Sequence, residues 1–297
     1  GDLVDREILN DTSKFITPPF EPLAVPEKGY QFHVTPFDIP SNTDREIFIY
    51  QPLNNSEPIY ISGYEIRMTP GSHHFILYNF GAGYTGQLPQ YETIRDVYNS
   101  SGDYNQSTLY YMQFHEFIAG TQVPSLRYNY PQGVALEVPA NTGFDLNSHY
   151  ANRTDASISG EVYANIYTVE PSEVIHTAKI LNLNNDEFVL PAGRVTTLTE
   201  SYTFHQDRYI FQLWSHAHEH NKEFKVYVVG GQRNDELIYY SNDWEHPPIL
   251  QIDPPLHLKA GEGLRLEATY DNWENRNLTF GLRSSDEMMI LFGAYYE

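Results

Sequence analysis

Residues 214–231 have the sequence WSHAHEHNKEFKVYVVGG, in which three histidines precede a strand-like run of residues. Next-nearest side chains of a β-strand project from one face and lie roughly 6.5–7 Å apart. In such a strand His216, His218 and His220 are close enough for two imidazoles to share one metal ion. The alternative is a set of three exposed histidines on a polar strand face.

The rest of the chain also favours an all-β fold. The aromatic residues Tyr, Phe and Trp make up 14% of the 297 residues, with 24 Tyr and 16 Phe. The apolar residues lie in short runs that are separated by some of the 19 Pro and 19 Gly. This composition is typical of all-β proteins. Long amphipathic helical patterns are nearly absent, whereas segments such as REIFIY at 45–50 alternate or cluster apolar residues as strands do.

Length and composition together predict two domains after an N-terminal arm. The chain is about twice the usual domain length. Residues 1–29 are Pro-rich and lack periodicity, so we expect an extended arm or linker, through which an upstream domain or anchor would connect. A second boundary is expected at EPSE, 170–173, which gives β-domains at 30–170 and 171–297.

Charge and cysteine content exclude several classes of protein and site. Lys and Arg number 18 against 39 Asp and Glu, so the formal charge is −21, which would repel nucleic acids and anionic lipid surfaces. No apolar run is long enough to span a membrane. Because the chain has no Cys, any metal must be held by His, Met or carboxylate.

The segment SSDEMMILFGAYYE, 284–297, places two methionines before a hydrophobic strand. Core packing is the default for Met288 and Met289. Alongside a strand of the His-x-His pattern, a thioether also becomes a candidate ligand, because it suits Cu(I) and is poor for zinc, magnesium or calcium.

A second histidine cluster begins in GSHHFILY, 71–78. His73 and His74 face opposite ways in a regular strand, so they can bind one ion only if the backbone bends, for which Thr69-Pro70-Gly71 provides a turn. An equally good interpretation of the pair alone is that one histidine is structural and the other lies on the surface. His149 in GFDLNSHYANRTD is a candidate third member. Six further histidines lack ligand spacing and are interpreted as structural or surface residues: His33, His115, His176, His205, His246 and His257.

The order HH, then HY, then HxH, then EM before an aromatic-rich strand resembles the copper type II, ascorbate-dependent monooxygenases. This family includes peptide α-hydroxylating and dopamine β-hydroxylating enzymes. The resemblance covers residues 30–297. It implies two jelly-roll-like antiparallel β-sandwich domains with a copper site in each, facing an interdomain cleft.

The resemblance also implies roles for the candidate ligands. One copper, which transfers electrons, would be held in the first domain by His73, His74 and His149. The second, catalytic copper would bind O2 in the second domain, held by His216, His218 and Met288, with His220 and Met289 as neighbours. The implied reaction is hydroxylation of a substrate C–H bond, with ascorbate or another one-electron reductant.

Departures from the family pattern bear on the substrate. Peptide-amidating members carry Arg, Asn and Tyr to hold a substrate carboxylate where this chain has Trp214, Ile290 and Phe292. Asn147 replaces a family glutamine two residues before the third histidine, and Phe75 replaces a methionine. We therefore expect a pocket formed by Trp214, Ile290, Phe292 and Asn147 for a small apolar or aromatic molecule. The missing family disulfides suggest a bacterial relative.

Two alternatives remain at this stage. A copper-binding or electron-carrying protein could keep these ligands without catalysis, and a two-sandwich carbohydrate or glycoprotein-processing module could share the fold alone. A secreted, periplasmic or cell-surface location is expected, because redox-active copper chemistry is usually kept outside the cytoplasm.

Overall fold

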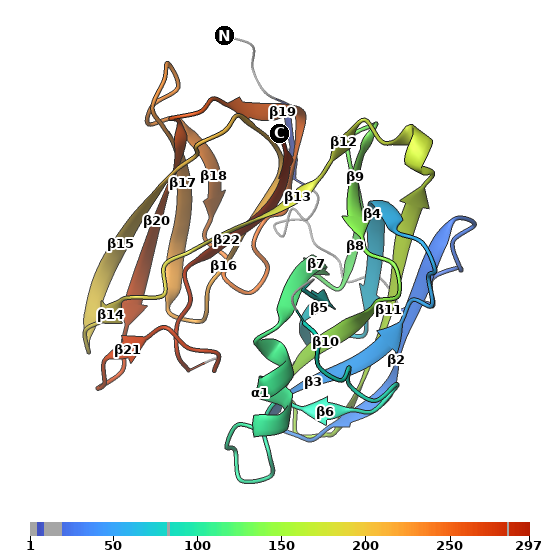
Figure 1. Ribbon diagram of the computed structural model, residues 1–297. Coiled ribbons are helices and arrows are strands. Elements are labelled where there is room, and N and C mark those ends of the chain that lie inside the picture. Colours follow the sequence, from blue (N-terminus) through green and yellow to red (C-terminus); the bar gives the residue numbers. More distant parts are fainter. Residues whose placement is uncertain (1–4, 9–19, 82–83, 284) are drawn as a thin grey trace. The chain divides into compact units, whose positions relative to one another are not determined.

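The computed structural model describes residues 5–8, 20–81, 84–283 and 285–297. It divides into two compact units (Figure 1). We call Ile16–Ile175 the N-terminal unit, and His176–Glu297 together with strand β1 (Asp5–Ile8) the C-terminal unit. Most of the arm expected at residues 1–29 lies outside the described residues, and the expected domain limits stay a prediction.

The N-terminal unit contains two antiparallel sheets. The first has the order β6-β3-β10-β5-β7, and the second contains β9-β4-β11-β2 with β8 also paired to β4. The strands and the helix are β2 (Gly29–Ile39), β3 (Thr43–Pro52), β4 (Ile59–Met68), β5 (Ser72–Phe80), β6 (Arg95–Asp96), α1 (Gln106–Met112), β7 (His115–Thr121), β8 (Ser125–Asn129), β9 (Val134–Val138), β10 (Gly143–Asn152) and β11 (Ile158–Val169).

Packing between the two sheets explains why β10 is almost wholly buried. It lies between β3 and β5, and Ala151 is its one residue that is not buried. Phe144 on β10 contacts Phe32 of the other sheet edge-on, with ring centroids 5.2 Å apart. The segment GFDLNSHYAN therefore places His149 on a strand whose backbone is fixed on both sides by hydrogen-bonded neighbours.

The C-terminal unit follows a 3-10 turn (Pro171–Glu173) and is likewise built of antiparallel sheets. Their strand orders are β1-β19-β16-β22-β13, β15-β20-β17-β18 and the pair β14-β21. The strands are β12 (His176–Thr177), β13 (Lys179–Asn184), β14 (Val189–Leu190), β15 (Arg194–Thr203), β16 (Arg208–His216), β17 (Asn221–Val229), β18 (Leu237–Ser241), β19 (Leu250–Leu258), β20 (Gly263–Asn272), β21 (Leu278–Thr279) and β22 (Ile290–Tyr296).

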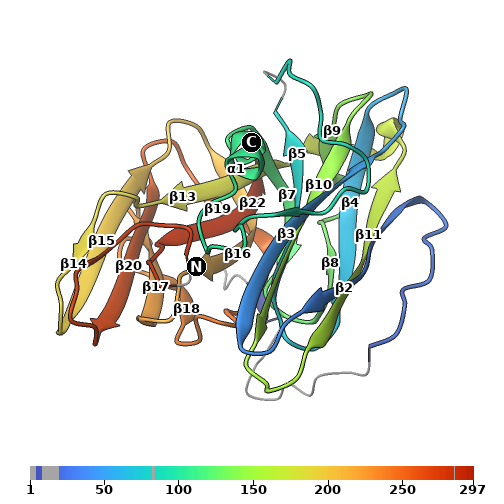
Figure 2. The same ribbon diagram turned by 90° about the horizontal axis from the view of Figure 1, so that it is seen from below.

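The two larger sheets of the C-terminal unit form two layers (Figure 2). Residues of both sheets contribute to one hydrophobic core. Leu213 and Leu291 enter it from β16 and β22, and Val226 and Leu266 enter it from β17 and β20. The alternating burial of β20 follows from the two-residue period of a strand with one face in the core. The prediction of an all-β fold of antiparallel sheets is confirmed.

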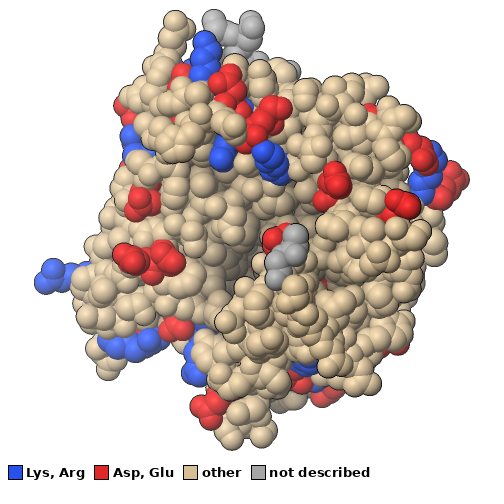
Figure 3. All heavy atoms as spheres, viewed as in Figure 1, with Lys and Arg blue, Asp and Glu red and all other residues tan. Residues whose placement is uncertain are grey.

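Charged side chains are scattered over the surface. On the face drawn in Figure 3, acidic and basic side chains are interspersed among uncharged ones. Among the described residues, the structure has no helix of the length and apolar character needed to cross a membrane.

Replacing Leu266 by Ala tests the position of this core. Leu266 is fully buried, so Leu266→Ala should lower the free energy of unfolding by about 2–5 kcal/mol through lost burial and the cavity left behind. Leu237→Ala, at a leucine that is 41% exposed, should change it by less than about 1 kcal/mol. Denaturant titration followed by circular dichroism measures both, and equal effects would contradict the assignment of the core.

Candidate metal centres

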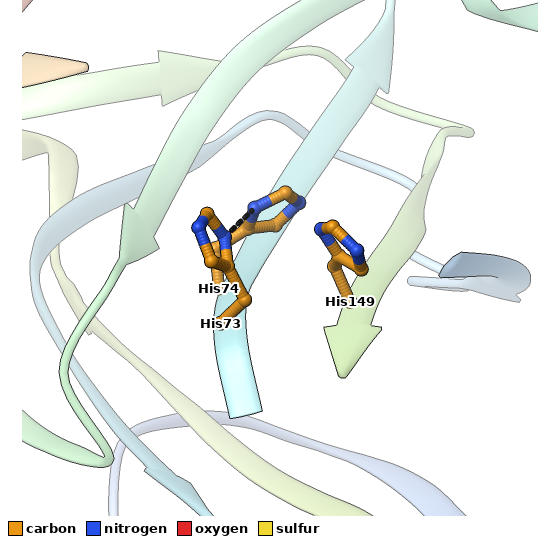
Figure 4. A group of neighbouring side chains, drawn as sticks. All are labelled: His73, His74 and His149. Carbon is orange, nitrogen blue, oxygen red and sulfur yellow. Dashed lines mark hydrogen bonds between the residues drawn. The ribbon is translucent and has the colours of Figure 1, made fainter. Parts of the chain in front are cut away.

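Three histidines meet inside the N-terminal unit (Figure 4). His73, His74 and His149 are all buried, and each offers one ring nitrogen within 4.8 Å of the others. The ring centroids of His149 lie 5.0 Å from those of His73 and 5.1 Å from those of His74. The structure therefore brings together the three residues expected to form the first site.

A β-bulge allows two adjacent histidines to take part. His149 on β10 pairs with His74 on β5, but the next residue, Tyr150, pairs with Ser72. His73 is thus an extra residue opposite a continuous strand, which breaks the strict alternation of side chains. Gly71, with φ +90°, lies just before the bulge. The bend that the sequence required is present as this bulge.

Asn147 fixes the protonation of His74. The amide nitrogen of Asn147 donates to Glu46 Oε1 at 2.9 Å and to the carbonyl of Ile47 at 3.3 Å, so its oxygen faces His74. His74 Nε2 lies 2.8 Å from that oxygen and must donate to it. His74 Nδ1 then carries the lone pair, and it faces His73 Nδ1 at 3.2 Å. Such outer contacts commonly orient metal-binding histidines.

Glu46 adds a negative charge to this cluster. Its carboxylate lies 3.7 Å from His74 Nε2. Burial by itself raises the pKa of Glu46, but the neighbouring imidazoles of His74 and His149 outweigh burial and lower the pKa to about 2. An ionised carboxylate at this place favours a cation bound by the neighbouring imidazoles.

The second histidine group lies at the end of β16 in the C-terminal unit. His216 is the last residue of β16, while His218 lies in the turn before β17. The two rings are nearly perpendicular, with centroids 5.4 Å apart. The segment is therefore a strand end and a turn, and the expectation of one continuous strand through HAHEH is wrong. Here the chain leaves β16 and crosses to β17, which belongs to the other large sheet of the unit.

Met288 is placed at the same end of the sheet. Ile290 on β22 pairs with His216 on β16, so Met288, two residues before Ile290, comes level with His218 in the antiparallel register. Met288 is 7% exposed, and its carbonyl accepts a hydrogen bond from the Tyr270 hydroxyl at 2.7 Å. Met289 points into the hydrophobic core.

A backbone carbonyl fixes the protonation of His218. The Nδ1 of His218 lies 3.0 Å from the carbonyl oxygen of Asp286, which can only accept, so Nδ1 carries the proton. The Nε2 of His218 is left with its lone pair, the form in which imidazole binds a metal.

Glu287 holds this turn together, and sequence reasoning missed it. One carboxylate oxygen accepts from the backbone N–H groups of His218 at 3.1 Å and Met288 at 3.3 Å, and the other accepts from that of His220 at 2.8 Å. Glu287 is fully buried, and this burial raises its pKa to about 8, against the opposing effect of these three donors. The only sequence signal is its place directly before Met288.

The residues expected to form a substrate pocket are distributed over both units. Trp214 and Phe292 stack at a centroid distance of 4.7 Å on paired strands, and Ile290 pairs with His216. These three face away from the core that Leu213 and Leu291 enter, since side chains alternate along a strand. Asn147 instead contacts His74 and Glu46.

Several scattered histidines are paired with carboxylates. His115 lies 2.9 Å from buried Asp145, and His33 lies 2.8 Å from Glu161. Such pairs fit the structural interpretation given to these histidines. His220 differs from them, because it joins Glu219 and Glu274 in a second group with metal-ligand spacing.

Comparison with known proteins assigns the C-terminal part of the chain. Residues 176–297 match the family model described as "Copper type II ascorbate-dependent monooxygenase, C-terminal domain". The C-terminal unit is therefore similar to this family over residues 176–297. The match supports a copper monooxygenase-like function, and imidazole with thioether is a ligand set that suits copper.

Other comparisons are less informative. No curated protein matches the chain. Similar solved structures include the STIV MCP, with 10% identity, a TM-score of 0.31 and coverage of 99% of this chain and 97% of that chain. Oxalate decarboxylase from Bacillus subtilis has 8% identity, a TM-score of 0.17 and coverage of 100% of this chain and 77% of that chain. Likenesses at these TM-scores indicate nothing about function.

Changing Glu287 to Gln tests its role in the turn. The amide keeps the volume but replaces one acceptor oxygen by an N–H donor group, so at least one backbone N–H loses its partner. Each orphaned donor should cost about 1–3 kcal/mol of unfolding free energy. Glu187→Gln, at an exposed glutamate of the same unit, should leave stability unchanged. Chemical denaturation compares the two, and equal stability would refute the role given to Glu287.

Proposed function

We propose that the protein is a copper-dependent monooxygenase that hydroxylates a C–H bond of a small apolar or aromatic substrate, with O2 and an external reductant such as ascorbate. The observation that carries this proposal is that His216, His218 and Met288 lie at one end of a sheet in a unit that is similar to the copper monooxygenase family. An extracytoplasmic location is part of the proposal.

Each unit would hold one copper ion. His73, His74 and His149 offer three nitrogens, a set suited to a copper that passes electrons. His216, His218 and Met288 offer two nitrogens and a sulfur, and the soft sulfur favours Cu(I), the state that reacts with O2. When bound, copper supplies one-electron redox chemistry and the activation of O2.

The protein's own residues prepare these ligands. Asn147 keeps the proton of His74 on Nε2, and the Asp286 carbonyl keeps that of His218 on Nδ1. Glu287 ties His218 to Met288 through their backbone N–H groups. Ligands that are oriented before the metal arrives lose less conformational entropy on binding it.

Apolar side chains beside His216 support the proposed substrate class. Phe292 lies 6.4 Å from His216 between ring centroids and stacks on Trp214. Trp214, Ile290 and Phe292 carry no charge that would pair with a substrate carboxylate. A substrate that approaches His216 along these side chains would gain from apolar contact.

Copper counting and O2 uptake test the function. With ascorbate present, the wild type should bind two Cu(I) ions per chain and consume O2, whereas His218→Ala and Met288→Ala should reduce uptake to the background rate. His205→Ala serves as a control, because His205 is exposed and outside the clusters. Equal uptake by all four proteins would overturn the proposal, and two coppers without substrate-dependent uptake would indicate an electron carrier.

Trp214→Arg tests the substrate class. A guanidinium beside the site would pair with a carboxylate, so the ratio of kcat/KM for a carboxylate-bearing substrate to that for its neutral analogue should rise roughly 10-fold or more, the effect of about 1.4 kcal/mol. The variant should still bind two coppers. A ratio that does not change would contradict the proposed position of Trp214 in the pocket.

A further inference from the structure

His220 has a buried ring nitrogen that the fold leaves unused. The residue is 0% exposed, and its Nδ1 lies 3.1 Å from Glu287 Oε1. Its Nε2 has no hydrogen-bond partner among the described residues. A buried polar atom without a hydrogen-bond partner lowers the free energy of unfolding by about 1–3 kcal/mol. Such an atom in a folded protein therefore indicates a role, such as binding a ligand.

Two carboxylates stand in front of this nitrogen. His220 Nε2 lies 3.7 Å from Glu274 Oε1, and Glu219, His220 and Glu274 each offer a ligand atom within 4.8 Å of the others. The other oxygen of Glu274 accepts a hydrogen bond from Arg276 Nε at 2.7 Å. Arg276 therefore orients the carboxylate and leaves Oε1 for another partner.

The backbone holds the two turns that carry these residues. Glu219 and His220 lie between β16 and β17, and Glu274 follows β20. The N–H of Asp271 donates to the carbonyl of His220 at 2.8 Å. The three ligand candidates thus come from segments that the sheet itself brings together.

We propose that Glu219, His220 and Glu274 bind a divalent transition-metal ion at a third site, distinct from the two proposed copper centres. One imidazole and two carboxylates suit Zn²⁺ or Cu²⁺, whereas Mg²⁺ and Ca²⁺ prefer ligand sets made of oxygen alone. The site lacks a thioether, so it does not favour Cu(I).

A metal on Nε2 would also brace the neighbouring turn. It requires the proton of His220 to be on Nδ1, which then donates to Glu287 Oε1. Glu287 also holds the backbone N–H groups of His218 and Met288. The third site therefore acts as a structural support for the segment that carries His218.

Nearby cations limit the affinity but do not block the site. Lys222 lies over the Trp273 ring at 5.0 Å, and Arg276 pairs with Glu274. Trp273 itself stacks on His220 with ring centroids 4.1 Å apart. This indole is 54% exposed and provides a fluorescent reporter next to the site.

Metal titration of the full chain tests the proposal. Under non-reducing conditions wild type should bind three Cu²⁺ ions per chain at saturation, two at the proposed copper centres and one at the third site, and Glu219→Gln/Glu274→Gln should bind one fewer, as measured by equilibrium dialysis with elemental analysis. Glu187→Gln, which removes an exposed carboxylate elsewhere in the unit, should match wild type. Equal stoichiometry in wild type and the double variant would overturn the third site.

A second measurement is independent of the copper centres. In a chain with His74→Ala and His218→Ala, Cu²⁺ should still quench the Trp273 emission, and Glu219→Gln/Glu274→Gln should weaken this quenching at least 10-fold in metal concentration. Trp273→Phe should remove the signal without lowering the number of bound ions. Quenching that does not depend on Glu219 and Glu274 would refute the proposal, while loss of the copper centres alone would leave it intact.

Discussion

A carboxylate in a protein interior is costly unless hydrogen-bond donors surround it, and Glu287 meets this condition with backbone N–H groups on both oxygens. These donors belong to the turn after β16 and to Met288 before β22, so one side chain joins the two segments that carry the candidate ligands. Without it two N–H groups of the turn and that of Met288 would have to be satisfied elsewhere. The relative position of His218 and Met288 therefore depends on this interaction as well as on the sheet register.

In both candidate copper centres an irregular backbone allows histidines that are close in sequence to face one metal ion, but the irregularity differs between the two. A flat strand places adjacent side chains on opposite faces, so two adjacent residues of it cannot bind one ion. In the N-terminal unit an extra residue, His73, breaks the alternation while the strand continues. In the C-terminal unit the strand ends at His216, and the chain turns before His218. Both devices keep one ligand on a rigid strand and adjust another through irregular backbone.

Particular residues show what could and could not be predicted from the sequence. The apolar pattern of segments such as residues 45–50 predicted an all-β fold, and the spacing of the histidines together with the family resemblance predicted the residues of both clusters, because side-chain period and ligand chemistry are local properties. The turn through HAHEH was mistaken for strand, because the hydrogen bonds of its backbone go to Glu287, which is 69 residues from His218. The contact of Asn147 with His74 depends on pairing between β5 and β10. Such long-range contacts leave no local pattern.

The sequence alone did not indicate which carboxylates contribute to the candidate metal centres, because the chain has 39 acidic residues. Burial separates them. Glu46, which is largely buried, lies near His74, and the fully buried Glu287 contacts the segment of His218 and Met288, so each histidine group has one such glutamate beside it. The ionised carboxylate of Glu46 strengthens the binding of a cation in a medium of low dielectric constant. Glu287 acts differently, through the backbone N–H groups that it accepts hydrogen bonds from.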